Sequence, residues 1–276
     1  MTSGSLVSIC IPTYRGSAFI GTTIESVLRQ THADFELIVV DDNSPDETEQ
    51  VVRRYTDPRV KYHRNRSNLG PQGNWNRCLE LARGIYFKLL PHDDLLTEDS
   101  LAKQVAVLEQ DSGKSIALVF GARQIIDASG HEIMTRGLSG QAAGRISSQE
   151  LVRRCIRAGA NLIGEPGSGL VRRELTARLG PYDASLPYVV DLDYWFKVLQ
   201  YGDGHYLDSV TSSFRLSKGS WSVAIGGYQF RDFTAFIDRV HKSGQFGLTL
   251  VDRAQGKFMA GVNTVARALM YRYVFR

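Results

Sequence analysis

The sequence predicts an α/β protein in which a mostly parallel open sheet carries helices on both faces and is followed by a helical C-terminal region. Two observations predict this class. In the first half of the chain, short apolar runs alternate with helical patterns, a rhythm typical of parallel strands joined by crossover helices. From Tyr228 onward, helical patterns dominate. There is no repeat, low-complexity tract or linker, so we expect one compact domain with a helical tail.

Four strands are expected in the first half, over residues 6–12, 35–42, 59–65 and 85–91, the third of them shorter. The helices after them are expected to end near residue 30, to begin at residue 45, and to cover 70–84 and 98–110. The second helix has a strong start signal, with Ser44 as N-cap, Pro45 at the first helical position and Glu47 three residues after the cap. Gly84 is expected to close the third helix, and Thr97 to cap the fourth.

The second half of the chain is less regular. Residues 116–133 predict a strand, a turn and a returning strand, and a capping box opens a helix at Ser147. The Gly- and Pro-rich segment 161–171 is interpreted as a loop, followed by a short helix to Leu179. Residues 191–202 then predict a helix that stops at a glycine.

The composition limits the class of partner. The formal net charge is +4 and the basic residues are spread along the chain, so nucleic-acid binding is not indicated. The three cysteines fit neither a zinc cluster nor a disulfide framework. The N-terminus lacks the basic start and apolar core of a signal peptide, and no apolar run approaches a membrane span. We therefore expect a cytoplasmic protein, at most peripheral at the inner face of the membrane.

Two of the predicted strands end on paired carboxylates. Asp41 and Asp42 close the second strand, and Asp93 and Asp94 follow the fourth. Ligands of open parallel sheets bind beyond the carboxyl ends of the strands, so these four groups would share one edge. They would repel one another unless a cation or a donor-rich ligand lies among them. An acidic turn exposed to solvent explains either pair when that pair is taken alone.

Three further motifs are consistent with a ligand at this edge. Tyr14 follows the first strand, where its ring can stack on a base or simply pack over the sheet. Gly70 permits close backbone approach to a ligand, or only a turn before a helix. Asp191 and Asp193 lie two residues apart at a helix start, so they cannot face the same way and only one can enter a site. Both can also do no more than complement the helix dipole.

The chain resembles a known family in two segments. Between residues 6 and about 100, the motifs VSICIPTYR, VVDDNSPDET, NLGPQGNWN and LLPHDD match, in order, the nucleotide-binding half of glycosyltransferase family 2, which has the GT-A fold. The resemblance resumes at GEPGSGLVRRELTARLGPYDASLPYVVDLDYWF, which is similar to the family's acceptor-side segment. It implies a catalytic domain over 1–225, with a nucleotide-sugar-binding half (6–115) and an acceptor-side half (116–225), and a C-terminal helical region over 226–276.

The resemblance implies an inverting transfer of a sugar from a nucleotide-diphosphate sugar to a hydroxyl of a polysaccharide or lipid-linked oligosaccharide. UDP- or dTDP-sugars are favoured over GDP-sugars, and Mn²⁺ or Mg²⁺ would bind the diphosphate. The positions that match the family's nucleotide-binding residues are Pro12, Thr13, Tyr14, Asp42, Gly70 and Asp93. Asp42 would accept a hydrogen bond from the base, Asp94 would hold the metal, and Asp191 would be the general base that deprotonates the acceptor hydroxyl.

Two positions depart from the family's pattern. The metal motif often reads Asp-x-Asp or Asp-Asp-Asp, and its first position here is His92, which we interpret as a neighbour rather than a ligand. In FRLSKGSWS, Ser217 occupies the position of a histidine that many relatives carry. If that histidine acts on the metal or the diphosphate, either the metal site is weaker here or Arg215 and Lys218 supply the charge instead.

Two other classes of protein stay open. A nucleotidyltransferase also uses a nucleotide pocket and metal carboxylates, but PTYRGSAF lacks the Gly-rich basic loop usual after its first strand. A non-catalytic sugar-nucleotide-binding protein would keep the base pocket but would not need Asp191.

The C-terminal region carries apolar residues at roughly helical spacing: Phe258, Met259, Val262, Val265, Ala266, Leu269, Tyr273 and Val274. Cations lie among them: Lys257, Arg267, Arg272 and Arg276. One interpretation is a helix packed on the catalytic domain. The other is an interfacial helix drawn to anionic lipid, near a lipid-linked acceptor.

Overall fold

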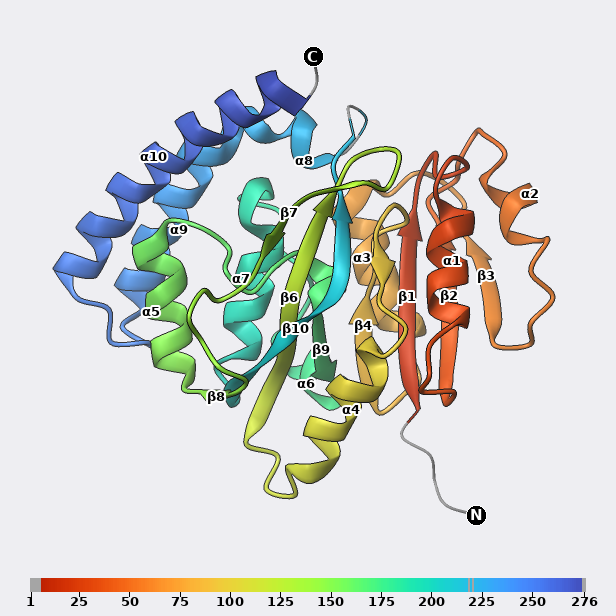
Figure 1. Ribbon diagram of the computed structural model, residues 1–276, viewed down its shortest axis with the longest axis horizontal. Coiled ribbons are helices and arrows are strands. Elements are labelled where there is room, and N and C mark those ends of the chain that lie inside the picture. Colours follow the sequence, from red (N-terminus) through yellow and green to blue (C-terminus); the bar gives the residue numbers. More distant parts are fainter. Residues whose placement is uncertain (1–5, 218, 220, 275–276) are drawn as a thin grey trace.

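One sheet of ten strands runs through the protein in the computed structural model, which describes residues 6–274 except 218 and 220. Its main path has the order β3-β2-β1-β4-β9-β6-β10-β5, with β7 beside β6 and β8 beside β10 (Figure 1). The strands are β1 (Val7–Thr13), β2 (Phe35–Asp41), β3 (Val60–Arg64), β4 (Tyr86–Leu89), β5 (Leu95–Leu96), β6 (Ile116–Ile126), β7 (Glu132–Arg136), β8 (Gly144–Ile146), β9 (Gly169–Arg172) and β10 (Asp203–Arg215).

Helices cover both faces of this sheet, as expected. The α-helices are α1 (Ile20–Leu28), α2 (Thr48–Val52), α3 (Gly70–Leu81), α4 (Ser100–Gln110), α5 (Ser148–Ala158), α6 (Arg173–Leu179), α7 (Val190–Val198), α8 (Trp221–Ala224), α9 (Gln229–Ser243) and α10 (Leu250–Val274). Single 3₁₀ turns are η1 (Pro166–Ser168), η2 (Pro187–Val189) and η3 (Gly226–Tyr228). The expected fold class, an α/β sheet followed by a helical C-terminal region, is confirmed.

The alternation of side chains along β1 shows how the two faces are filled. Ile9 and Ile11 point into a core formed with α1 and α4, while Cys10 between them points into the core formed with α3, α5, α7 and α9. Successive strand residues face opposite sides, so a strand covered on both sides is buried along its whole length. All seven residues of β1 are buried, and so are all seven of β2.

The parallel strands of the first half end together. β1 pairs in parallel with β2 and β4, and β2 with β3; the last register pair of β1 and β2 joins Thr13 to Asp41. Just beyond it, the backbone N–H of Asp42 donates to the carbonyl of Thr13 at 2.8 Å. The strand ends that were expected to carry the ligand site therefore lie side by side at one edge.

The segment 161–171, interpreted from its glycines and proline as a loop, contains a central strand. β9 pairs antiparallel with β4 on one side and β6 on the other. Gly169 begins the strand because the indole of Trp195 leaves no room: a Cβ there would lie 2.5 Å from the ring. The glycine that indicated a loop serves close packing instead.

β10 is the longest strand, and the sequence pattern did not indicate it. It pairs in parallel with β6, with register shifts along its length. Polar residues that break the alternation are nevertheless buried there, including Thr211, Ser212 and Ser213. Hydroxyl groups satisfied inside the sheet, such as Ser213 Oγ on Gln124 Oε1 at 3.3 Å, explain why apolar periodicity failed to find the strand.

Three expected helix boundaries are wrong. α4 begins at Ser100 with Asp99 as its N-cap, rather than at Glu98 with Thr97 as its cap. α2 begins at Thr48 rather than Pro45, because Ser44 Oγ accepts the backbone N–H of Arg15 at 2.9 Å and is not available as a cap. α3 ends at Leu81 and does not reach Gly84. A Cβ on Gly84 would lie 2.6 Å from the carbonyl of Leu6, so this glycine permits close approach to the chain entering β1.

The C-terminal helix α10 packs against α5 and α9 (Figure 1). The buried carboxylate of Asp252 accepts from Arg157 at 2.5 Å, and the amide of Asn263 donates to the carbonyls of Ala158 and Gly159 at 2.8 and 2.9 Å. The expectation of a helix packed on the rest of the chain is confirmed for the inner face of α10. No helix within the described residues is long and apolar enough to cross a membrane.

Candidate active site

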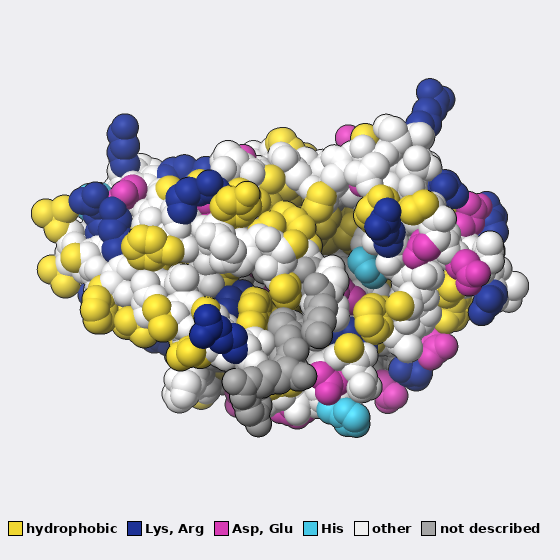
Figure 2. Space-filling model, turned by 90° about the horizontal axis from the view of Figure 1, so that it is seen from above, with side chains coloured by type: hydrophobic (Ala, Val, Ile, Leu, Met, Phe, Trp, Pro, Cys, Tyr) yellow, Lys and Arg dark blue, Asp and Glu magenta, His cyan; other side chains and the backbone are white. Residues whose placement is uncertain are grey.

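A cleft of about 1050 Å³ lies at the carboxyl ends of the strands. Figure 2 looks onto this edge of the sheet and shows the surface hollowed near its centre. The cleft-lining residues include seven of the eight predicted site residues: Pro12, Thr13, Tyr14, Asp42, Gly70, Asp93 and Asp191. The fold thus gathers residues from distant parts of the chain around one space.

The end of the cleft near β1 is built on buried amides. Asn74 of α3 donates to the carbonyl of Val40 at 2.9 Å, and its side-chain oxygen accepts from Asn65 at 3.0 Å. Asn65 in turn donates to Asp42 at 2.8 Å. A charged or polar group buried at a strand end needs such partners, and this network fixes the position of Asp42.

Asp42 is more fully engaged by the protein than the sequence indicated. Its carboxylate accepts from the side chain of Asn65 and from the backbone N–H groups of Leu69 and Gly70, at 2.8, 2.8 and 2.9 Å. A carboxylate has about four acceptor sites, so about one remains for a ligand. Gly70 has φ +75°, a conformation that glycine adopts without strain and that turns its N–H toward Asp42.

Tyr14 and Thr13 present an aromatic ring and a hydroxyl to the cleft. Tyr14 is 40% exposed, and the guanidinium of Arg15 lies 5.4 Å from its ring centroid. Thr13 is buried, and its hydroxyl has no hydrogen-bond partner within the described part of the chain. An unpartnered buried hydroxyl in a cleft is a group that a ligand can satisfy.

The two carboxylates after β4 differ in a way that the sequence did not reveal. Asp93 lines the cleft, whereas Asp94 is 1% exposed, does not line it, and accepts the backbone N–H of Arg215 at 3.0 Å. Burial and the charge of Asp93 raise the pKa of Asp94 well above its ordinary value. The sequence-based hypothesis assigned the metal to Asp94 and the ribose or sugar to Asp93, whereas only the carboxylate of Asp93 lines the cleft.

Arg215 is buried and does not line the cleft. Its side chain donates to the carbonyls of Asp93, Asp127 and Ala128, and it is 4% exposed. Arg215 instead ties the end of β10 to the turn that carries Asp93. Ser217 lines the cleft, and Lys218 lies outside the described residues.

Asp191 lies in the first turn of α7, at the wall opposite β1. One carboxylate oxygen accepts from the amide of Asn161 at 2.9 Å and the other from the backbone N–H of Leu192 at 2.8 Å. Burial, followed by the negative charge of Glu165, raises the pKa of Asp191 to about 7. A carboxylate with such a pKa can accept a proton near neutral pH.

Asp193 faces away from the cleft, as the two-residue spacing predicted for one of the pair. It forms ion pairs with Arg239 at 2.8 Å and Lys197 at 2.9 Å. Trp195 follows Asp191 by one helical turn and lies on the same side of α7 as Asp191. Its indole N–H donates to the carbonyl of Gly164 at 2.8 Å. Asn161 also donates to this carbonyl, so the loop before η1 positions both side chains.

Several cleft residues were not identified from the sequence. They include the aromatic residues Trp75, Tyr188 and Trp221 and the charged residues Arg123, Arg136, Glu165 and Arg267. One signal was available for Arg123. It is a charge inside the apolar run IALVFGARQII, and a charge in a buried strand needs an ion-pair or hydrogen-bond partner. Arg267 comes from α10, whose cations were interpreted only in relation to lipid.

The residues present fit a divalent cation that is shared with a diphosphate. Such a cation takes one or two protein carboxylates and completes its shell with phosphate and water. The carboxylate of Asp93 meets this need, since it lines the cleft and no donor in the described chain hydrogen-bonds to it. No cluster of three or more His, Cys, Asp or Glu within the described residues could hold a metal without such help.

A parallel sheet with a cleft at its strand ends, a half-buried Asp in the first turn of α7 and an antiparallel strand between β4 and β6 define a GT-A-type protein. The model of the family "Glycosyl transferase family 2" matches residues 8–172, and the chain belongs to this family. The expected family is therefore confirmed.

Relatives with similar sequences agree with this family. An uncharacterized glycosyltransferase of Rickettsia typhi is 30% identical over 72% of this chain and 60% of its own length. An uncharacterized protein of Mycobacterium tuberculosis is 30% identical over 70% of this chain and 62% of its own, so the chain spans less than two thirds of either. A UDP-Glc:α-D-GlcNAc-diphosphoundecaprenol β-1,3-glucosyltransferase of Escherichia coli, WfgD, is 29% identical over 79% of each chain.

Solved structures share the fold. TarS of S. aureus (residues 1–349), in complex with UDP-GlcNAc, has a TM-score of 0.65 and 19% identity over 84% of this chain and 66% of its own. The mannosyltransferase PcManGT of Pyrobaculum calidifontis, in complex with GDP-Man and Mn²⁺, has a TM-score of 0.62 and 18% identity over 98% and 76%. At these identities the likeness establishes the GT-A fold alone.

Proposed function

We propose that the protein is an inverting glycosyltransferase that moves a sugar from a nucleotide-diphosphate sugar to a hydroxyl of an acceptor. Membership of glycosyl transferase family 2 supports the class of reaction. The observation that carries the mechanism is Asp191, a carboxylate held by two donors inside the same cleft as the strand-end residues.

In the proposed reaction, Asp191 takes the proton of the acceptor hydroxyl while that oxygen attacks the anomeric carbon of the donor sugar. The bond from this carbon to the diphosphate oxygen breaks, the nucleoside diphosphate leaves with the electron pair, and the proton ends on Asp191. Attack from the side opposite the leaving group inverts the anomeric configuration. Asn161 and Leu192 stabilise the ionised carboxylate through their hydrogen bonds before the proton arrives.

The nucleotide is proposed to bind at the β1 end of the cleft. Tyr14 would stack on the base, with Pro12 and Thr13 beside it and Gly70 allowing close backbone approach. The acceptor site left on Asp42 requires a base that donates an N–H, as uracil and thymine do. A UDP- or dTDP-sugar is therefore the proposed donor.

The diphosphate is proposed to lie beside Asp93, with Mn²⁺ or Mg²⁺ as the cofactor. Asp93, rather than Asp94, would hold the metal because its carboxylate faces the cleft. When bound, the metal would neutralise charge that develops on the leaving diphosphate. Asp94 would keep the turn in place through its bond to Arg215.

A saccharide or a lipid-linked saccharide is the proposed acceptor, by analogy with WfgD, whose name specifies a diphosphoundecaprenol-linked GlcNAc acceptor. Polysaccharide biosynthesis for the cell envelope, on the cytoplasmic side of the membrane, remains the proposed setting. Division into a catalytic domain over 1–225 and a C-terminal region over 226–276 also remains a proposal, with the qualification that α10 lines the cleft.

The two alternative classes are less well supported. A non-catalytic sugar-nucleotide-binding protein has no need to hold Asp191 in the cleft at a pKa of about 7. A nucleotidyltransferase needs a basic Gly-rich loop after β1, and the chain there offers only Arg15 and Gly16.

Calorimetric titration of UDP, dTDP and GDP with and without Mn²⁺ tests the donor site, and NMR of the product's anomeric carbon tests the stereochemistry. We expect metal-dependent binding of UDP or dTDP that is tighter than that of GDP, and inversion at the anomeric carbon. A preference for GDP would contradict the base pocket, and a retained configuration would contradict the mechanism.

A further inference from the structure

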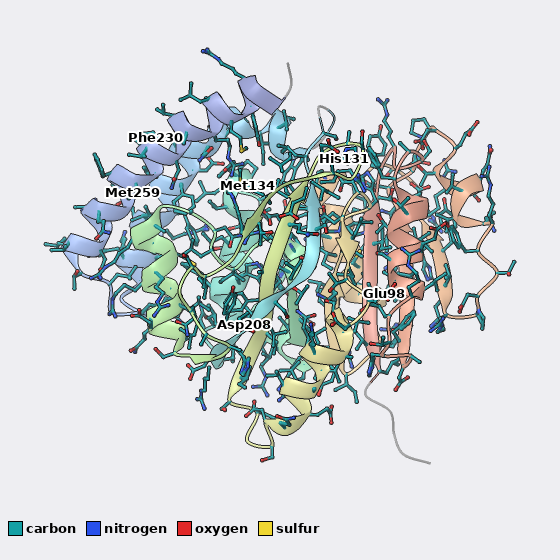
Figure 3. The ribbon with its side chains drawn as sticks, viewed as in Figure 1. Glu98, His131, Met134, Asp208, Phe230 and Met259 are labelled. Carbon is teal, nitrogen blue, oxygen red and sulfur yellow. The ribbon has the colours of Figure 1, made fainter. Side chains whose placement is uncertain are left out.

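Two arginines face each other directly across β6 and β7. Arg123 and Arg136 are register partners in this antiparallel pair, so their side chains leave the same face of the ribbon. Both line the cleft, as do Ile125 and Met134 two residues along each strand. Figure 3 labels Met134 between the sheet and the C-terminal helices. Like charges directly opposite each other destabilise a sheet.

Of these two arginines, only Arg123 forms an ion pair within the described residues. Arg123 is buried, and its Nε lies 2.5 Å from an oxygen of Glu165. Arg136 makes no ion pair or hydrogen bond with any residue of the described chain. Arg136 is exposed to solvent. Partial desolvation, followed by the charge of Arg123, lowers the pKa of Arg136, and the charge of Glu165 acts in the opposite direction.

A third arginine reaches the same part of the cleft from α10. The guanidinium of Arg267 lies 5.1 Å from the ring centroid of Tyr188 and 5.9 Å from that of Tyr271. No carboxylate in the described chain lies within ion-pair distance of it. The aromatic faces hold this planar group in place without neutralising it.

These arginines lie beside Asp191 rather than at the base end of the cleft. The carbonyl of Asn161 accepts from Arg123 at 3.1 Å, and the amide of the same Asn161 donates to Asp191. β4 and β9 separate β1 from β6, and three inter-strand steps amount to about 14 Å. Arg123, Arg136 and Arg267 form a cationic wall of the cleft. This wall therefore lies on the acceptor side of Asp191, away from Tyr14.

We propose that Arg136 and Arg267, backed by Arg123, bind a phosphate group of the acceptor. The inference rests on the proposed function and specifies its acceptor as a phosphate-bearing one. A neutral sugar hydroxyl needs no cation, whereas guanidinium groups bind phosphate oxygens through charge-assisted, often bidentate, hydrogen bonds. Either the diphosphate of a lipid-linked saccharide or the phosphodiester of a polyol-phosphate chain supplies this chemistry.

The test measures binding of three probes to the full chain saturated with UDP and Mn²⁺. The probes are farnesyl-diphosphate-linked N-acetylglucosamine, the farnesyl glycoside of the same sugar without phosphate, and a glycerol-phosphate oligomer. Each is titrated into wild type, Arg136→Gln and Arg267→Gln. Arg145→Gln is the matched control, because Arg145 pairs with Asp203 outside this cleft. UDP affinity is measured separately for every protein.

We expect wild type to bind a phosphate-bearing probe at least about tenfold more tightly than the neutral glycoside, and each cleft variant to lose about tenfold of that affinity with UDP binding unchanged. Whichever phosphate probe binds more tightly identifies the source. Equal affinity for charged and neutral probes would overturn the proposal. If Arg136→Gln lost as much affinity for UDP as for the phosphate-bearing probe, these arginines would bind the donor rather than the acceptor, which would overturn the proposal. Absence of UDP binding in wild type would contradict the proposed function itself.

Discussion

The pH dependence of the reaction should be controlled at a single residue, Asp191. Its pKa is raised to about 7 by burial and by Glu165, and the base acts only when ionised. Below pH 7 the carboxyl group is protonated in a growing fraction of molecules. We expect kcat/KM to fall about tenfold per pH unit on the acid side, with a midpoint near 7, in a profile of initial rates.

Replacing the charge next to Asp191 should move that profile. Glu165→Gln removes a negative charge that favours the protonated form, so the midpoint should shift to lower pH. Glu174→Gln is the matched control, since Glu174 pairs with Lys114 on the surface and does not line the cleft. An unchanged midpoint in Glu165→Gln, with the fold intact, would show that another group sets the acid limb.

The carboxylates after β4 give a second prediction at this scale. Asp93→Ala should weaken Mn²⁺-dependent UDP binding by at least about tenfold in calorimetry, because the group facing the metal is lost. Asp94→Ala should instead lower the free energy of unfolding by about 1–3 kcal/mol, since the backbone N–H of Arg215 loses its partner. If Asp94→Ala weakened Mn²⁺-dependent UDP binding and Asp93→Ala did not, Asp94 would be the metal ligand.

Sequence motifs located the strand-end residues well but not their exposure. Pro12, Thr13, Tyr14, Asp42, Gly70, Asp93 and Asp191 all reach the cleft. Asp94 is turned away from the cleft because it accepts the backbone N–H of Arg215, which lies on a strand 121 residues later. Such a long-range hydrogen bond leaves no local pattern. The same holds for Arg136, which becomes a cleft residue only because β7 returns beside β6.

At the scale of elements, β9 shows how a local signal can mislead. Glycine and proline near residue 167 indicate a loop, yet the chain continues into a strand between β4 and β6. Gly169→Ala should destabilise the protein by about 1–3 kcal/mol, because the new Cβ would meet the indole of Trp195 at 2.5 Å. Thermal unfolding against Gly113→Ala, which adds a Cβ in open space, measures this effect. Equal melting temperatures would contradict the packing argument.

Apolar strands and amphipathic helices were predictable because burial alone defines their pattern. α1, β2 and β4 follow the expected runs, and the capping box at Ser147 opens α5 as expected, with Ser147 accepting from the N–H of Glu150. α2 begins late because Ser44 binds Arg15 across the strand ends. Elements whose polar groups are satisfied by distant partners, such as β10, could not be recognised from periodicity.

At the scale of the whole molecule, α10 serves two surfaces. Arg267 and Met270 line the cleft, while the opposite side of the helix exposes Phe258 by 71%, Val265 by 62% and Leu269 by 60%. Figure 2 shows hydrophobic side chains interspersed with Lys and Arg on the side formed by the C-terminal helices. Peripheral contact with an anionic membrane through this exposed face remains a prediction.

Flotation with vesicles tests the membrane contact. We expect wild type to float with phosphatidylglycerol-containing vesicles, and the triple variant Phe258→Ser, Val265→Ser, Leu269→Ser to lose this binding. The three side chains are exposed, so the fold should be unaffected. Ile85→Ser, which changes an exposed apolar residue at the opposite part of the sheet, is the control. Equal flotation of wild type and the triple variant would remove the membrane interpretation.

The central claim is that Asp191 is the base of an inverting transfer, and its direct test compares kcat with donor affinity in Asp191→Asn. The amide keeps the shape but cannot take a proton, so kcat should fall by about two to four orders of magnitude. The dissociation constant of the donor should stay within about twofold, because the residue acts on the acceptor. Asp193→Asn is the matched control, and its loss of ion pairs to Arg239 and Lys197 should appear in stability rather than in kcat. Transfer that survives in Asp191→Asn and is lost in Asp193→Asn would contradict the account.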